Sequence, residues 1–165
     1  AAAHGLDALP HGGGPAVDVL IGGDGNDILV GGSGDDTMTG GTGSDAFVWN
    51  AGDQRIAGAP AIDTVMDFNS AETGTLNLGE GDVLNLADLL DAAAGDDLSH
   101  YLHFDKVGDD TVVSISSDGG FNAGFSAGAV DQQIVLTGVD LTTLGNGDAG
   151  IIAALTAGGD PNLIV

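Results

Sequence analysis

The sequence has almost no basic residues. Lys and Arg together number 2, against 25 Asp and Glu, so the formal net charge at pH 7 is −23. A chain this acidic repels phosphate backbones and anionic lipid headgroups, which argues against nucleic acids and membrane surfaces as partners. The same repulsion opposes a compact fold until cations bind. Divalent cations are therefore the expected partners.

Cysteine is absent, and so are long apolar runs. No disulfide can stabilise the fold, and no run reaches the roughly 18 residues of a transmembrane helix, so we expect no membrane insertion. Residues 1–12 lack the basic and apolar regions of a Sec signal peptide and are interpreted as a linker. Because a repeat begins directly after them, we expect the chain to be the C-terminal part of a longer protein.

Glycine, in contrast, is abundant, and much of it falls in a tandem repeat. Three nonapeptides run from Gly22 to Val48, each fitting G-G-x-G-x-D-x-U-x, where U is a large apolar residue. A degenerate copy over 13–21 precedes them and has Ala16 at the fourth position. The repeated residues are Asp18, Asp27, Asp36 and Asp45, and at the U position Leu20, Leu29, Met38 and Phe47. Agreement over consecutive copies predicts a repeat architecture.

Each nonapeptide is expected to form a turn followed by a short strand. Glycine reaches positive φ without steric cost, so G-G-x-G-x-D suits a turn. The last three residues suit a strand whose U side chain points away from its two neighbours. Successive turns then lie on opposite edges, and two nonapeptides complete one coil of a parallel β-roll. Asp18 and Asp36 stack on one edge, and Asp27 and Asp45 on the other, about 4.8 Å apart.

Stacked carboxylates indicate a cation site, because like charges this close cannot both stay ionised alone. Calcium accepts six to eight oxygen ligands at about 2.3–2.6 Å, whereas magnesium requires a strict octahedron. Carboxylates and the turn carbonyls together supply such a set. The expected ligand residues of the array are Asp18, Asp27, Asp36, Asp45, Gly22, Asp24, Gly31, Ser33, Gly40 and Thr42. The alternative interpretation is a flexible acidic linker. A linker would not need a large apolar residue at every ninth position, as this array has.

The residues beside U differ between copies. Val19, Ile21, Ile28 and Val30 flank U in the first two copies, where the third has threonines. We therefore expect the outer faces of the early strands to be covered, by the C-terminal half or by upstream chain.

Residues 50–165 should cap the roll, because two coils about 10 Å tall are too short to be stable alone. Alternation predicts strands over 61–68, 81–86, 101–106, 111–116 and 132–137, with short helices over 87–94 and 150–157. Asp63 lies eighteen residues after Asp45 and could extend the Asp27–Asp45 edge, although chance explains the spacing equally well. The expected fold is all-β: a short parallel β-roll (β-solenoid) over 13–49, capped over 50–165 by further strands with a few short helices.

The array resembles the RTX (repeats-in-toxin) calcium-binding repeat. The segment Asp63-x-Val-x-Asp67-Phe, followed by Gly81-Asp82-x-Leu-x-Leu-x-Asp-Leu-Leu, is similar to the region after RTX arrays in type I secretion target domains. In that family such acidic residues can bind further calcium, which adds Asp63, Asp67 and Asp82 as candidate ligands. Tyr101-Leu-x-Phe, Asp110-Thr-x-Val-x-Ile, Gln132-x-Ile-Val-Leu-x-Gly-Val-Asp-Leu and the apolar terminus look like the secretion domain of large Gram-negative RTX adhesins.

This resemblance implies a calcium-binding C-terminal module of a secreted RTX adhesin, with a role in biofilm formation or cell adhesion. The module would fold on extracellular calcium and carry an uncleaved type I secretion signal, read by an ABC transporter machine. It would be secreted or lie on the Gram-negative cell surface, and the isolated domain is expected to be a monomer. The alternatives are the RTX module of a secreted hydrolase, such as a serralysin-type protease or lipase, and a calcium-dependent ligand-binding adhesion domain.

We expect no catalytic activity in this segment. Residues 124–128 match G-x-S-x-G, but that motif needs a buried strand before it and a helix after it, and here it lies in a glycine-rich loop. His100 and His103 would point to opposite faces of a strand, which is unsuited to binding one zinc ion. The sequence thus predicts a binding module.

Overall fold

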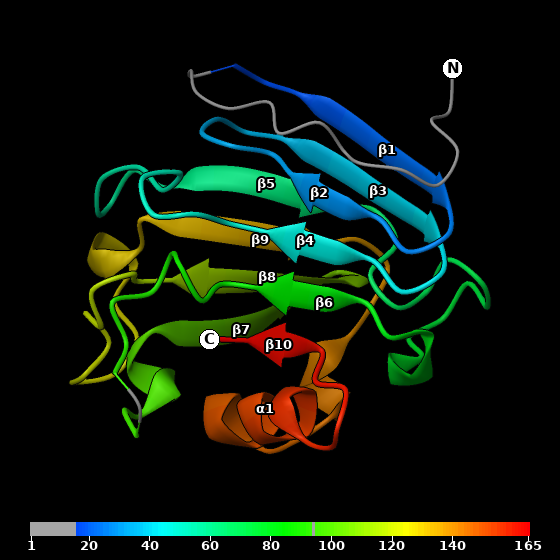
Figure 1. Ribbon diagram of the computed structural model, residues 1–165. Helices are drawn as coiled ribbons and strands as arrows, with labels where there is room; N and C mark the ends of the chain where they lie inside the picture. The colour runs from blue at the N-terminus through cyan, green and yellow to red at the C-terminus, as the bar shows by residue number, and fades with distance from the viewer. Residues whose placement is uncertain (1–15, 94) are drawn as a thin grey trace.

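Two β-sheets face each other in the computed structural model, which describes residues 16–93 and 95–165 (Figure 1). The larger sheet has six strands in the order β1-β3-β5-β9-β8-β7, and the smaller has four in the order β10-β6-β4-β2. The strands are β1 Val19–Asp24, β2 Ile28–Val30, β3 Thr37–Thr42, β4 Ala46–Val48, β5 Ala61–Val65, β6 Val83–Asn85, β7 Leu102–Val107, β8 Asp110–Ile115, β9 Gln132–Leu136 and β10 Leu163–Ile164. One α-helix, α1 Gly147–Thr156, and four 3₁₀ turns, Leu78–Glu80, Leu98–His100, Ala127–Ala129 and Leu141–Thr143, complete the described part of the chain.

The nonapeptides form a parallel β-roll. Strands β1 and β3 pair in one sheet, β2 and β4 in the other, and residues eighteen apart lie opposite each other, as Leu20 does Met38. The chain therefore alternates between the sheets at each glycine turn. The U side chains point inward and are buried. The predicted all-β fold with a parallel roll is confirmed.

The roll continues beyond the repeats. Strand β5 pairs in parallel with β3, and β6 with β4, so the two form a third coil without nonapeptides. Strands β9 and β10 then pair in parallel with β5 and β6. The inward columns are Leu20, Met38, Val65 and Leu136 in the larger sheet and Leu29, Phe47, Leu84 and Leu163 in the smaller. Each coil thus extends one apolar core.

Antiparallel strands and the helix close the far end of the roll. Strand β8 pairs antiparallel with β9 and with β7, and the three strands correspond to the stretches predicted as strands over 101–106, 111–116 and 132–137. In Figure 1, α1 lies below β7 and β10, and its Ile151, Ile152 and Leu155 are buried in the core. The Asp148 carboxylate fixes the first turn of the helix by accepting from the backbone N–H of Phe104 at 2.9 Å.

The helix predicted over 87–94 is wrong for the described residues 87–93, which form an irregular turn. The N–H groups of Leu89 and Leu90 both reach the carbonyl of Leu86, but the N–H of Asp91 then pairs with the carbonyl of Ser117. The hydrogen bond from Asp91 to Ser117 therefore ends the helical segment after a single turn. Within the described ranges, no helix has the length and apolar character needed to span a membrane.

The C-terminal half does not cover the outer faces of the early strands, contrary to one of the two expectations. Val19 is 71% exposed, Ile21 57% and Ile28 58%, whereas Val30 is partly buried. The later coils are added along the roll axis. Their strands therefore lie beside the early strands in the same two sheets and leave the outer faces of the early strands open.

Candidate metal centre

Two columns of aspartates run along the edges of the roll. The backbone N–H of Asp18 donates to Oδ1 of Asp36 at 2.8 Å, and that of Asp27 donates to Oδ1 of Asp45 at 2.9 Å. In each pair the carboxylate of the later coil therefore accepts the amide of the earlier one. The predicted stacking of Asp18 with Asp36, and of Asp27 with Asp45, is confirmed.

Three array carboxylates each hold one oxygen that lacks a donor. Oδ2 of Asp27, Asp36 and Asp45 is buried and has no hydrogen-bond partner in the described part of the chain. A buried, unpaired carboxylate oxygen costs several kcal/mol unless a cation or donor compensates it. The donor set of these turns therefore fits a bound hard cation.

Each unpaired oxygen lies against the first glycine of its own turn. A Cβ on Gly22 would come within 2.6 Å of Oδ2 of Asp27, and one on Gly31 within 2.6 Å of Oδ2 of Asp36; Gly40 and Asp45 stand in the same relation. The carbonyl oxygen of Gly40, in the next coil, lies 2.5 Å from the Cβ position of Gly22, so a backbone carbonyl also faces this space. Glycine leaves this space open between carboxylate and carbonyl oxygens.

Burial makes these carboxylates costly to ionise. It raises the pKa of the Asp45 carboxyl to about 6 against the opposing effect of the Asp27 N–H, and neighbouring carboxylates add to the rise. Burial likewise raises the pKa of the Asp36 carboxyl, and the charges of Asp18 and Asp35 act in the same direction. A divalent cation would remove this penalty, since it favours the ionised form.

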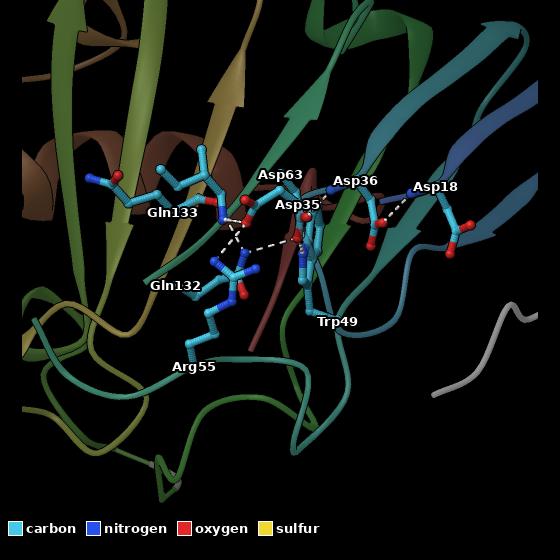
Figure 2. Close-up of polar contacts among 9 residues, drawn as sticks. Asp18, Asp35, Asp36, Trp49, Arg55, Asp63, Gln132 and Gln133 are labelled. Atoms are coloured by element: carbon cyan, nitrogen blue, oxygen red, sulfur yellow. Dashed lines mark hydrogen bonds and ion pairs between the residues drawn. The ribbon is translucent and has the colours of Figure 1, made fainter. Parts of the chain in front are cut away.

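Asp63 continues the Asp18–Asp36 column, so the expectation that it extends the Asp27–Asp45 edge is wrong. Its Oδ1 accepts the N–H of Asp36 at 2.7 Å, and Figure 2 shows Asp18, Asp36 and Asp63 in one line. In the array, eighteen residues complete a full coil. Residues 49–60 instead make a long excursion with a small bridge between Ile56 and Ala59, so eighteen residues from Asp45 complete only half a coil.

Asp82 continues the other column. Its Oδ1 accepts the N–H of Asp45 at 2.9 Å, and its Oδ2 accepts the N–H of Asn69 at 2.7 Å. Asn69 has a positive φ of 48°, and its Oδ1 in turn accepts the N–H of Asp82 at 2.8 Å. Burial raises the pKa of the Asp63 and Asp82 carboxyls to about 6 in each case, against the hydrogen bonds that they accept.

Asp67 caps the last glycine turn of the array. Its two oxygens accept the N–H groups of Gly40 and Gly41, at 2.9 and 2.8 Å. Sequence reasoning placed Asp63, Asp67 and Asp82 at calcium, and these ligand roles stay predictions. In the structure the carboxylates of these three residues accept hydrogen bonds from backbone N–H groups.

Two further predicted residues, Asp24 and Thr42, end strands β1 and β3, which run on into the residues predicted as turns. Asp24 is exposed, and its Oδ1 accepts from Oγ1 of Thr42 at 2.9 Å. Asp35, beside Asp36, pairs with Arg55 at 3.1 Å, a half-exposed ion pair of small energetic weight. Throughout the described ranges no three His, Cys, Asp or Glu side chains converge on one point, so any calcium site here depends on backbone carbonyls.

Three residues at the columns were missed by sequence reasoning: Trp49, Asn69 and Gln132. Trp49 and Gln132 both donate to Oδ2 of Asp63, at 2.6 and 2.9 Å (Figure 2). Nothing in the local sequence signals these bonds, because Gln132 lies 69 residues from Asp63. The tolerance of asparagine for positive φ was the one available hint at Asn69.

Comparisons with known proteins support the metal assignment. Residues 12–47 match the family model of the RTX calcium-binding nonapeptide repeat, in four copies. The chain therefore carries RTX repeats, and calcium is the ion that such repeats bind. None of the curated proteins matches the chain.

Two solved structures are similar to it. The AlgE6R3 subunit of the mannuronan C5-epimerase of Azotobacter vinelandii has 18% identity over 96% of this chain and 86% of that chain, with a TM-score of 0.47. The AlgE6R2 subunit of the same enzyme has 19% identity over 96% and 93%, with a TM-score of 0.39.

Proposed function

We propose that the domain is a calcium-binding module whose array coils fold when calcium occupies the glycine turns. The observation that carries this proposal is the set of unpaired, buried Oδ2 atoms at Asp27, Asp36 and Asp45 within RTX repeats. Calcium at each turn would be held by that oxygen and by turn carbonyls, including those of Gly22, Asp24, Gly31, Ser33, Gly40 and Thr42. The ion supplies positive charge where the fold stacks carboxylates. The module binds and has no catalytic role.

Linkage explains how such a site acts as a switch. Extracellular calcium modules have dissociation constants near 10⁻⁴–10⁻³ M, so they are nearly empty at cytoplasmic calcium levels. At a hundredfold excess over the dissociation constant, each site stabilises the folded state by about 2.7 kcal/mol. Several sites would convert an array with unpaired carboxylates from unfolded to folded outside the cell.

We further propose that the module is the C-terminal part of a secreted RTX adhesin of a Gram-negative cell and carries its type I secretion signal. The support is the sequence after the array, from Asp63 to Leu90 and from Tyr101 onward. Export of a passenger fused to residues 13–165, in cells carrying a type I ABC transporter system, tests this. A passenger that remains inside, while a known type I substrate is exported, would contradict it.

Asp36→Asn tests the calcium site. The asparagine keeps an Oδ1 acceptor for the N–H of Asp18 but removes the charge and the unpaired oxygen. We expect the calcium midpoint to rise at least tenfold, roughly the loss seen when even outer-shell partners of metal ligands are removed. Circular dichroism across a calcium titration measures it.

The matched control is Asp109→Asn, which removes the same charge from an exposed position in the β7–β8 turn. It should leave the midpoint within about twofold, because only long-range, screened electrostatics change. Equal shifts in the two variants would show that net charge matters and that Asp36 is no ligand.

A further inference from the structure

The carboxylates of the third coil differ from those of the array in how their second oxygen is satisfied. In Asp36 and Asp45, Oδ1 accepts an amide and Oδ2 has no donor in the described ranges. In Asp63, Oδ2 accepts from Nε1 of Trp49 and Nε2 of Gln132. In Asp82, Oδ2 accepts the N–H of Asn69. After the repeats end, the Oδ2 atom of each column aspartate thus accepts hydrogen bonds from N–H groups of the protein.

We infer that in the third coil fixed N–H donors replace the calcium ion, so that the roll from β5 onward folds without calcium and serves as the template for the array coils. Hydrogen bonds to a carboxylate favour its charged form, as a cation does. The inference rests on the proposed function, because it divides the domain into a part that needs the ion and a part that does not.

The junction between the two parts is also satisfied by the protein. Asp67 accepts the N–H groups of Gly40 and Gly41, and Oγ of Ser44 donates to the carbonyl of Glu80 at 2.7 Å. The last array turn therefore meets acceptors that already belong to the template. Array coils can be added to a surface whose hydrogen-bonding groups are in place.

Packing supports independent folding of the template. The part of the chain from β5 onward buries most of the large side chains of the core, including Phe68, Leu102, Ile115, Ile134 and Leu141. The first two coils contribute only one U side chain per strand to the centre. Most of the buried apolar surface thus lies in the part of the roll in which N–H donors stand in place of the cation.

Hydrogen exchange measured by mass spectrometry, in chelator and in millimolar calcium, tests the inference. We expect residues 61–65, 83–85 and 132–136 to be protected in both conditions, and residues 28–30, 37–42 and 46–48 to be protected only in calcium. If the array and the template both lose protection in chelator, the inference is wrong and the proposed function stands. If the array stays protected in chelator, the proposed function is wrong.

Gln132→Glu tests the donor mechanism directly. The change removes the Nε2 donor and places a second carboxylate against Oδ2 of Asp63. Protection of 61–65 in chelator should fall by at least a hundredfold. The matched control is Gln133→Glu, which adds the same charge on the same strand where the amide contacts Oγ of Ser114. Equal losses in both variants would overturn the inference.

A milder variant covers the case in which Gln132→Glu does not fold at all. Trp49→Phe keeps a buried aromatic ring and removes the Nε1 donor to Asp63. Losing one hydrogen bond to a charged acceptor should lower protection of 61–65 in chelator by about tenfold to a hundredfold. Protection equal to that of the parent chain would mean that the donor does not stabilise the template.

Discussion

Gly41→Ala should leave the first two coils unfolded at every calcium concentration. Gly41 has a φ of 98°, and a Cβ there would overlap the carbonyl oxygen of Gly23, a backbone atom of the coil beside it. Because the two turns are stacked through their backbones, neither atom can move away without breaking the stack. We expect the free energy of unfolding to fall by on the order of 4–5 kcal/mol. Losses this large are exceptional and arise from a few mechanisms, among them disruption of a specific backbone conformation.

The matched control for this variant is Gly52→Ala. Gly52 has the same φ of 98°, but its Cβ position meets no atom of the described residues within 4 Å. Backbone strain alone then costs about 1–2 kcal/mol. Calcium titrations followed by circular dichroism, with thermal unfolding in saturating calcium, compare the two. A similar cost in both variants would show that the approach of the turns is looser than the structure indicates.

Acidification should have opposite effects with and without calcium. The carboxyls of Asp63 and Asp82, in the part of the roll that should fold without calcium, have pKa values of about 6 in the fold against an ordinary 3.8. The folded state therefore holds protons more tightly than the unfolded chain between about pH 4 and pH 6. In calcium-free buffer the free energy of unfolding should fall as the pH rises through this window and level off above it, by up to about 3 kcal/mol for one carboxyl.

In calcium the sign reverses for the array, because protons compete with the ion for its carboxylates, among them that of Asp45, whose pKa burial raises to about 6. The calcium midpoint should rise as the pH falls from 7.5 to 5. Urea unfolding followed by the fluorescence of Trp49 measures the first effect, and calcium titrations at the same pH values measure the second. Asp63→Asn should flatten the calcium-free profile. A calcium-free stability that increases from pH 5 to pH 7.5 would contradict the assignment of raised pKa values.

The array could be predicted from sequence because its period is local. Nine residues fix one turn and one strand, so the inward position of Leu29 and the stacking of Asp27 with Asp45 follow from counting. The same counting misplaced Asp63, since the loop before it does not keep the period. The acceptor roles of Asp67 and Asp82 could not be predicted, because their partners Gly40 and Asn69 are defined by tertiary position.

The continuation of the roll was beyond sequence reasoning for a related reason. Strand β10 has two residues, too few to show alternation, and β9 looks the same whether it pairs in parallel or antiparallel. Parallel pairing between distant segments leaves no local signature. The helix predicted over 87–94, which the described residues 87–93 do not form, shows the reverse case. There the tertiary hydrogen bond between Asp91 and Ser117 outweighs good local helix propensity.

The last coil also determines when the fold can be completed. Strands β1 and β3 are joined by a short connection, whereas Leu84 pairs with Leu163 near the C-terminal end. Closing that longer loop costs about 1 kcal/mol more entropy, and contacts of this kind form late in folding. A chain that emerges from the ribosome, N-terminus first, must therefore be synthesised past Leu163 before β6 gains its second neighbour. Until then the edge of β6 is open to incorrect strand pairing.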